Sequence, residues 1–180
     1  MDTLLTILGI IVGIVVVVAI LAAVAPKAYS VQRSVVIDKP CQQVFEYVKY
    51  LRNQDNYSKW VMTDPNKRMT YNGTDGTCGY SSAWDSDVKQ AGKGVQTIEN
   101  IVDGERIDIR VVFIKPFAGA ADTYIATTPV TDNTTSVTWN FDSKMPYPMN
   151  MMLLFINMEK MLGADMNESL ANLKRVVEKL

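Results

Sequence analysis

A run of mostly apolar residues opens the chain, starting at Leu4 and ending at Ala25, and no charged side chain interrupts it. A helix needs roughly 20 residues to cross the hydrocarbon core of a bilayer. The valines at positions 15–18 form helix poorly in water, but in lipid the backbone must satisfy its own hydrogen bonds, and a helix does so. We therefore expect a transmembrane anchor over residues 1–27, with residues 4–25 in the membrane.

Two other interpretations of this run fit less well. A cleaved signal peptide normally has a basic start and a shorter apolar stretch, whereas this chain begins Met-Asp-Thr, and Pro26 follows its only Ala-Val-Ala sequence. A buried core helix would contain polar residues at regular intervals, which this run lacks. Lys27, Arg33 and Lys39 follow the run, and because basic residues prefer the cytoplasmic side, we expect the rest of the chain in the cytoplasm.

Polar and apolar residues alternate in the next segment, residues 28–37, which predicts a strand. Pro40 then suits the first turn of a helix, and apolar residues recur behind it at helical spacing. Short strand-like runs follow, separated by Gly, Asn and Asp, and Asp103-Gly104 is a strong hairpin signal. These runs predict an antiparallel meander of about six strands, at residues 69–72, 77–85, 94–102, 106–115, 121–130 and 136–142.

The pattern beyond Pro146 and Pro148 is helical to the end of the chain, and Gly163 is a point where this helix is expected to kink or break. A curved sheet must bury its apolar face, and this helix is the only predicted element long enough to cover it. The fold class is therefore α+β, with a curved antiparallel sheet wrapped on a long C-terminal helix over residues 28–180. Its apolar stripe consists of Leu170, Leu173, Val177 and Leu180.

Composition excludes several classes of function. The chain of 180 residues has a net charge of -1 and no histidine. The basic residues are scattered, which argues against nucleic acid as a partner. Without imidazole, Ser-His-Asp catalysis and most zinc or iron sites are excluded as usually built, so we expect no metal and no cofactor. The sequence leaves a single disulfide between Cys41 and Cys78 open, but two cysteines far apart in the chain are more typical of a reducing compartment than of a disulfide framework.

Local features spread over residues 29–180, mostly turn glycines and core aromatics, match those of a known family. They are Pro40 with Val44 and Phe45, Trp60, Asp64-Pro65, Gly76, Gly79, Trp84, the turn from Gly92 to Gly94, Val137-Thr138-Trp139, Gly163, Glu168-Ser169-Leu170 and Leu173-Lys174. With the order of elements, this set resembles the helix-grip fold of the START-like, or SRPBCC, superfamily, and within it the polyketide cyclase/dehydrase-like group. The resemblance implies a deep apolar cavity under the long helix. Members bind lipids, sterols, polyketides, quinones or hormones, and some are enzymes, so the fold alone does not choose among these.

Aromatic and methionine side chains are the candidate ligand-binding residues. Tryptophan and tyrosine rings can stack on a ring system, and flexible, polarisable methionines adapt to variable apolar ligands. Ordinary core packing is the alternative for each of them, and the sequence does not say which face of the sheet is concave. The candidates are Tyr80, Trp84, Phe113, Tyr124, Trp139, Met149, Met152 and Phe155.

Three functions remain open at this point. The first is a membrane-anchored module that binds a hydrophobic small molecule such as a lipid, a quinone or a polyketide-like compound. The second is a cyclase/dehydratase-type enzyme, in which a desolvated carboxyl or tyrosine moves protons. The third is a protein-interaction module, which an exposed apolar patch would favour. The polar candidates for the second function are Tyr80, Tyr124, Glu99, Asp122 and Asp142.

Overall fold

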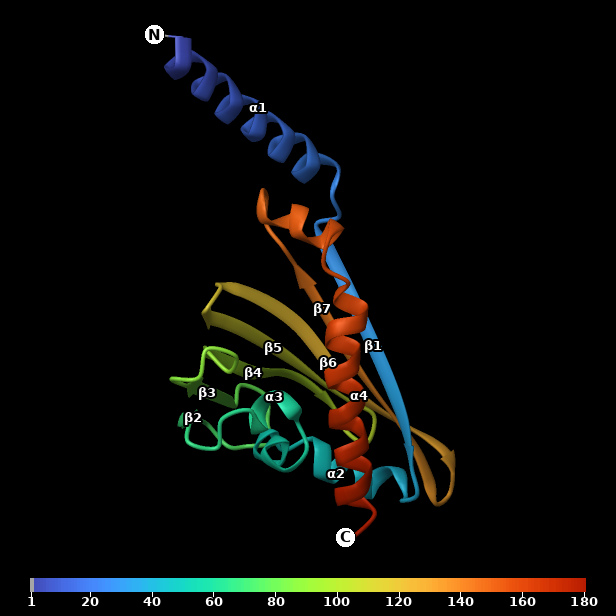
Figure 1. The fold of residues 1–180 in the computed structure, drawn as a ribbon. Coiled ribbons are helices and arrows are strands. Elements are labelled where there is room, and N and C mark those ends of the chain that lie inside the picture. Colours follow the sequence, from blue (N-terminus) through green and yellow to red (C-terminus); the bar gives the residue numbers. More distant parts are fainter. Residues whose placement is uncertain (1) are drawn as a thin grey trace.

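An exposed apolar helix projects from the rest of the molecule (Figure 1). The computed structural model describes residues 2–180, so Met1, the first residue of the predicted anchor, lies outside the described part. Helix α1 (Asp2–Val24) has an apolar stretch over Thr3–Val24 that is long enough to cross a membrane, and only 6% of it is buried. An exposed N-terminal helix of this kind is typical both of a membrane span and of a signal sequence.

The remainder is a seven-stranded antiparallel sheet in the order β1-β7-β6-β5-β4-β3-β2. This confirms the predicted sequence of one strand, one helical segment, six strands and a C-terminal helix. The first and last strands in the chain pair along their full length, so β1 closes the sheet beside β7. The strands are β1 (Ala28–Ile37), β2 (Arg68–Asn72), β3 (Ser81–Asp85), β4 (Lys93–Val102), β5 (Arg106–Lys115), β6 (Gly119–Thr131) and β7 (Thr134–Lys144).

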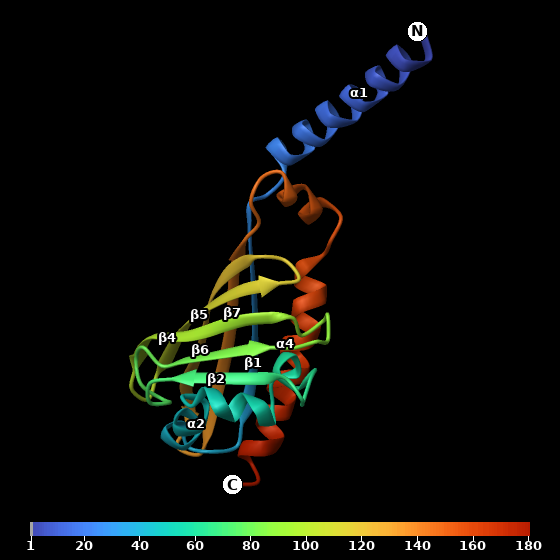
Figure 2. The same ribbon diagram turned by 90° about the vertical axis from the view of Figure 1, so that its left-hand side faces the viewer.

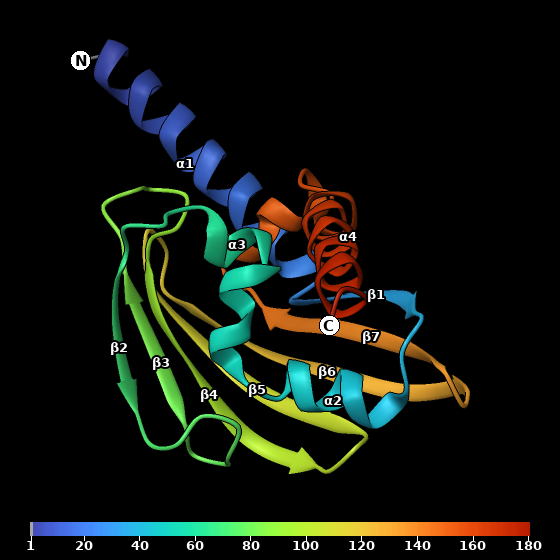
Figure 3. The same ribbon diagram turned by 90° about the horizontal axis from the view of Figure 1, so that it is seen from below.

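Helices fill the concave side of this sheet, as the view from below shows (Figure 3). The long helix α4 (Met158–Val177) crosses it beside β1, and α2 (Cys41–Val48), η1 (Leu51–Asn56) and α3 (Lys59–Met62) line the rest. Helix α4 buries Leu170 and Leu173 from the predicted stripe, and α2 buries Phe45. The core therefore lies between the sheet and these helices, as expected for a helix-grip fold.

In strand β5, alternate side chains face the core and the solvent, as the sequence pattern predicts. Ile107 and Ile109 are buried against the core, while Arg110 points to solvent and forms an ion pair with Asp122 of β6 at 2.5 Å. Asp103-Gly104 makes the predicted turn, because Val102 pairs with Arg106 and Gly104 adopts a positive φ of 74°. A left-handed φ favours glycine, which explains the strength of the hairpin signal.

Two predicted boundaries differ from the structure by more than two residues. The strand expected over residues 77–85 begins only at Ser81, because Gly76 and Gly79 have positive φ values of 77° and 85° and place residues 77–80 in turns. The C-terminal helix does not break at Gly163. It breaks at Asn157, whose side chain caps α4 by accepting a hydrogen bond from the Lys160 amide at 2.8 Å.

Gly163 instead allows α4 to pack closely on β1. A Cβ atom at this position would come within 2.0 Å of the Arg33 guanidinium, which forms an ion pair with Glu159 at 2.6 Å. Before α4 lies a separate 3-10 segment, η2 (Met149–Leu154). The amide of Asn150 in η2 donates hydrogen bonds to the carbonyl oxygens of Ala22 at 2.7 Å and Ala25 at 3.2 Å. These bonds fix the end of α1 to the domain.

Tyr57 is fully buried, and its hydroxyl has no hydrogen-bond partner among residues 2–180. Burial raises the pKa of this hydroxyl above its usual value. An unpaired polar atom in a core is destabilising, so Tyr57→Phe should increase the free energy of unfolding by about 1 kcal/mol. Urea denaturation of residues 28–180 measures this change. Tyr47→Phe is the matched control, since the Tyr47 hydroxyl accepts a bond from Asn56 at 3.1 Å, and a gain in stability there too would contradict the explanation.

Candidate functional site

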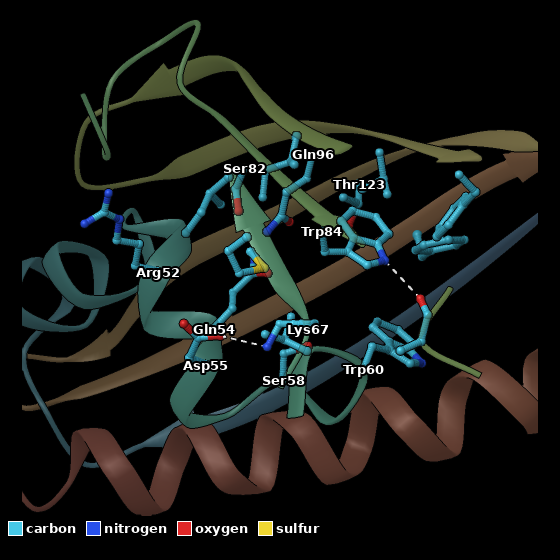
Figure 4. Close-up of a pocket in the computed structure, with 18 of the residues that line it drawn as sticks. Arg52, Gln54, Asp55, Ser58, Trp60, Lys67, Ser82, Trp84, Gln96 and Thr123 are labelled. Carbon is cyan, nitrogen blue, oxygen red and sulfur yellow. Dashed lines mark hydrogen bonds and ion pairs between the residues drawn. The ribbon is translucent and has the colours of Figure 1, made fainter. Parts of the chain in front are cut away.

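A cavity of about 250 Å³ lies between the concave face of the sheet and the helical segment from η1 to α4 (Figure 4). Strands β2 to β7 contribute its floor, η1 and α3 one wall, and Leu162 of α4 its edge. The loop before β4 and the turn after β5 complete the rim with Gln90, Ala91, Lys115 and Pro116. The volume is slightly below the usual range for small-molecule pockets, which begins at about 300 Å³.

One side of the cavity is aromatic. Trp60 and Trp139 meet edge to face with ring centroids 5.5 Å apart, and Trp84 and Phe113 do so at 6.1 Å. The Phe141 ring centroid lies 6.0 Å from that of Trp60 and 6.5 Å from that of Phe113, which joins the two pairs into one continuous cluster of rings. Edge-to-face packing is a favourable arrangement of aromatic rings. The cavity therefore has an apolar wall whose rings are already packed against one another.

Each indole N–H in this wall is already bonded within the protein. Trp139 donates to the Thr123 hydroxyl at 2.9 Å, Trp60 to the Asp165 carboxylate at 3.1 Å and Trp84 to the Ala91 carbonyl at 2.9 Å. The Thr123 hydroxyl in turn donates a hydrogen bond to the backbone carbonyl oxygen of Asn140. Because these donors are occupied, the tryptophans offer apolar ring surface to a ligand and no free hydrogen-bond donor.

The opposite side of the cavity is polar. Lys67 and Asp55 point toward each other there, away from the tryptophans (Figure 4). The Lys67 ammonium is 3.4 Å from the Asp55 carboxylate and 3.4 Å from the Asp64 carbonyl, and its side chain is only 10% exposed. Both distances are longer than a good charge-assisted hydrogen bond. A cation held so loosely keeps capacity to bind an anionic or carbonyl oxygen. Gln54, Ser58, Ser82 and Gln96 add neutral polar groups to the lining.

Asp64 holds the loop that carries Lys67 into the cavity. Its carboxylate accepts a hydrogen bond from the Ser86 hydroxyl and another from the backbone N–H of Asn66 at 2.9 Å. The bond from Ser86, followed by the one from Asn66, lowers the pKa of the Asp64 carboxyl below its usual value. These bonds connect the loop before β2 to the loop after β3, and they hold in place the segment that carries Lys67. Among residues 2–180, no cluster of three Cys, Asp or Glu side chains is placed to hold a metal ion.

A sequence profile described as "Polyketide cyclase / dehydrase and lipid transport" matches residues 28–178. The chain belongs to this family. Members of the polyketide cyclase/dehydrase family bind hydrophobic small molecules in the cavity of this fold. No curated protein matches the sequence.

Solved structures show the same cyclase/dehydrase fold at low identity. A protein from Thermobifida fusca aligns over 84% of this chain and 94% of its own, with a TM-score of 0.61 at 15% identity. Protein CV1439 from Chromobacterium violaceum aligns over 83% and 96%, with a TM-score of 0.58 at 16% identity. Norcoclaurine synthase from Thalictrum flavum, in complex with dopamine and hydroxybenzaldehyde, aligns over 89% and 92%, with a TM-score of 0.61 at 8% identity. Likeness at these identities extends to the fold alone.

Three of the candidate residues from the sequence line the cavity of this cyclase/dehydrase domain: Trp84, Phe113 and Trp139. Tyr80 is fully buried beside it, and its hydroxyl accepts a hydrogen bond from the Arg52 guanidinium at 3.3 Å. Burial raises the pKa of this hydroxyl, and the bond from Arg52 partly opposes that rise. Tyr80 is therefore a core residue whose polar end is already occupied.

The other candidates lie away from the cavity. Tyr124 is on the convex face, where the Arg106 guanidinium stacks 3.8 Å from its ring. Met149, Met152 and Phe155 belong to η2 and its end, and they are 45%, 37% and 73% exposed. The structure does not bring them to the aromatic cluster. The acidic candidates Glu99, Asp122 and Asp142 are also exposed and outside the lining.

Several lining residues were not singled out from the sequence. Phe141 could have been found, because it shares a face of β7 with Trp139. Lys67 and Asp55 gave no signal, because both lie outside strands, where no periodicity shows which way a side chain points. Trp60 faces the cavity from the single helical turn α3, which is too short to show a pattern.

Proposed function

We propose that this chain binds an apolar, ring-containing small molecule in the cavity, while α1 holds it on a membrane with the domain in the cytoplasm. The observation that carries the proposal is the division of the cavity into a preformed aromatic wall and a polar side with a poorly bonded lysine. Norcoclaurine synthase, which shares the fold, was solved with two aromatic compounds. The exposed helix α1 supports membrane attachment, which in turn favours a membrane-soluble ligand.

The polar side of the cavity limits which functional groups a ligand should carry. A molecule with an apolar ring body and one anionic or carbonyl oxygen would place its ring on Trp84 and Trp139 and its oxygen at Lys67. A neutral hydrocarbon would leave the Lys67 ammonium without a good partner in a mostly desolvated position, which is unfavourable. We therefore expect ring acids, phenols or quinone-like carbonyl compounds to bind better than hydrocarbons of the same size.

The direct experiment is to purify the full chain from membranes in mild detergent and examine it by native mass spectrometry. A ring-containing apolar molecule at near-stoichiometric level would support the proposal. A protein with no bound molecule, which also fails to bind any ring acid or phenol in titration, would count against it. Extraction of the membranes with alkaline carbonate tests attachment separately, since a transmembrane chain stays with the lipid.

Replacing Lys67 tests the polar side. Lys67→Met keeps most of the side-chain volume and removes the charge, so it should weaken binding of an anionic ring probe by about tenfold, which corresponds to about 1.4 kcal/mol. The measurement is fluorescence titration of residues 28–180 with 1-anilinonaphthalene-8-sulfonate. The neutral probe N-phenyl-1-naphthylamine has the same rings without the sulfonate and should bind with unchanged affinity. Equal losses for both probes would mean that Lys67 only supports the shape of the cavity.

Acid–base catalysis is the second candidate, and one observation favours it. Asp55 and Lys67 are two titratable groups that meet at one cavity, at 3.4 Å. Such a pair could take a proton from a ligand and return it. Asp55, however, is 47% exposed, so water reaches its carboxylate freely. Conversion of a co-purified ligand by the intact protein, lost in Asp55→Asn, would establish this function.

A further inference from the structure

The segment between β7 and α4 is apolar and exposed. Residues 145–158 contain no charged side chain. Five of their side chains project from the surface, with exposed fractions from 37% to 73%. Exposed apolar residues scattered singly are normal, but a contiguous set indicates a surface that another phase or molecule covers. The five are Tyr147, Met149, Met152, Leu154 and Phe155.

This segment is fixed to the end of α1. Asn150 is fully buried, and its side-chain amide donates hydrogen bonds to the carbonyl oxygens of Ala22, in the last turn of α1, and of Ala25, just after it. The last carbonyl groups of a helix have no partner within the helix, so such bonds stabilise its end. Ala22 and Ala25 are themselves buried there, at 0% and 5% exposure. The place where α1 meets the domain is therefore also the place where η2 displays its apolar side chains. With α1 across a bilayer, η2 lies at the level of the lipid headgroups.

A second exposed apolar point lies at the same end of the domain. The end of β5 and the turn that follows it present Ile114 at 48% and Phe117 at 74% exposure. Figures 1 and 2 both show this turn on the side of the domain from which α1 departs. Lys27 and Lys144 are exposed beside α1 and η2. Aromatic side chains flanked by lysines are typical of the interface between a bilayer and water.

We propose that η2 and the β5–β6 turn form a second membrane contact, which inserts Phe155 and Phe117 into the headgroup layer around α1. This surface, which we call the membrane foot, consists of residues 147–155 and 114–117. The inference rests on the proposed membrane attachment through α1. The occupant is a lipid surface, because the foot continues directly from the only helix of the described residues 2–180 that is apolar enough to span a bilayer.

The membrane foot also places the cavity rim against the bilayer. Lys115 and Pro116 belong both to the β5–β6 turn and to the rim. The loop before β4 is packed on them, because a Cβ atom on Gly92 would lie 2.1 Å from the Lys115 carbonyl oxygen. Docking of the foot therefore brings this edge of the cavity to the headgroups. A membrane-soluble ligand then passes between bilayer and cavity without crossing water.

The test is the depth of spin labels on the full chain in nanodiscs of phosphatidylcholine and phosphatidylglycerol. Cys41 and Cys78 are first replaced by serine, and single cysteines are introduced as Phe155→Cys, Phe117→Cys and, as a control, Val130→Cys. Val130 is 57% exposed in β6, near the β6–β7 turn. Labels at 155 and 117 should show severalfold higher contact with oxygen and lower contact with a water-soluble nickel chelate than the label at 130.

A label introduced as Val12→Cys within α1 distinguishes failure of the membrane foot from failure of the membrane anchor. If position 12 reports the bilayer interior while positions 155 and 117 match position 130, the membrane foot is refuted and the anchor stands. If position 12 also reports water, the anchor itself fails. If position 155 is immobilised away from lipid, with spin–spin broadening that disappears on dilution with unlabelled protein, a second copy of the chain covers η2, and the lipid contact is refuted.

Discussion

Val111→Trp should abolish most ligand binding without unfolding the protein. Val111 lies on the concave face of β5 and lines the cavity. An indole at this position would occupy space that a ring-containing ligand needs. The ligand must then shift or be excluded, and a loss of about 1.4 kcal/mol already lowers affinity tenfold. We expect at least a tenfold loss, because strain from forced packing is commonly about 1–3 kcal/mol.

The adjacent residue provides the matched control for this change. Val112 is on the opposite face of the same strand and is 38% exposed. Val112→Trp adds the same indole to β5 but directs it to solvent, so affinity should stay unchanged. The measurement is titration of residues 28–180 with N-phenyl-1-naphthylamine, after circular dichroism has shown that each variant is folded. Equal affinities for the two variants would place the ligand outside this cavity.

Gly94→Val should be the most destabilising single change at the cavity wall. Gly94 is buried in β4 between its cross-strand partners Trp84 and Phe113. A Cβ atom there would lie 2.5 Å from the Trp84 ring and 2.6 Å from the Val112 carbonyl oxygen. The ring could move, but the carbonyl belongs to the paired backbone of β5. We expect a loss of about 3 kcal/mol in the free energy of unfolding, at the upper end of typical overpacking costs.

The same change should also reduce ligand affinity, because a displaced Trp84 would enter the cavity. Urea denaturation and probe titration of residues 28–180 measure the two effects. Gly119→Val is the control, since no atom lies within 4 Å of a Cβ built on Gly119, and it should be close to neutral. A stable Gly94→Val variant with normal affinity would show that the wall adapts easily and is not preformed.

The sequence predicts most of the fold, because the strands and the long helix each have one solvent-exposed and one buried face, which gives a periodic pattern of polar and apolar residues. Alternation in β5 correctly placed Ile107 and Ile109 inside, and the helical stripe correctly placed Leu170 and Leu173 against the sheet. The errors came where the backbone departs from a regular period. The positive φ of Gly79 delayed β3, and the cap at Asn157 broke the C-terminal segment earlier than Gly163.

The candidate site was harder to predict, because hydrophobicity does not say what covers a side chain. Met149, Met152 and Phe155 have the composition expected of an adaptable cavity wall, yet the structure leaves them exposed beside α1. The same residues would suit a core, a ligand or a lipid surface, and only their position in space separates these. Lys67 was missed for the converse reason. A lysine in a loop is usually solvated, and no periodic pattern in the sequence shows that only 10% of this side chain is exposed.

The short connection between α1 and the sheet sets how far the domain can travel. Helix α1 ends at Val24 and β1 begins at Ala28, so residues 25–27 alone form the tether. Extended, they span only about 10 Å. If α1 spans a bilayer as proposed, a connection of this length keeps the domain at the surface of that bilayer. A bound molecule would then be exchanged with the same bilayer or with an acceptor that comes to it.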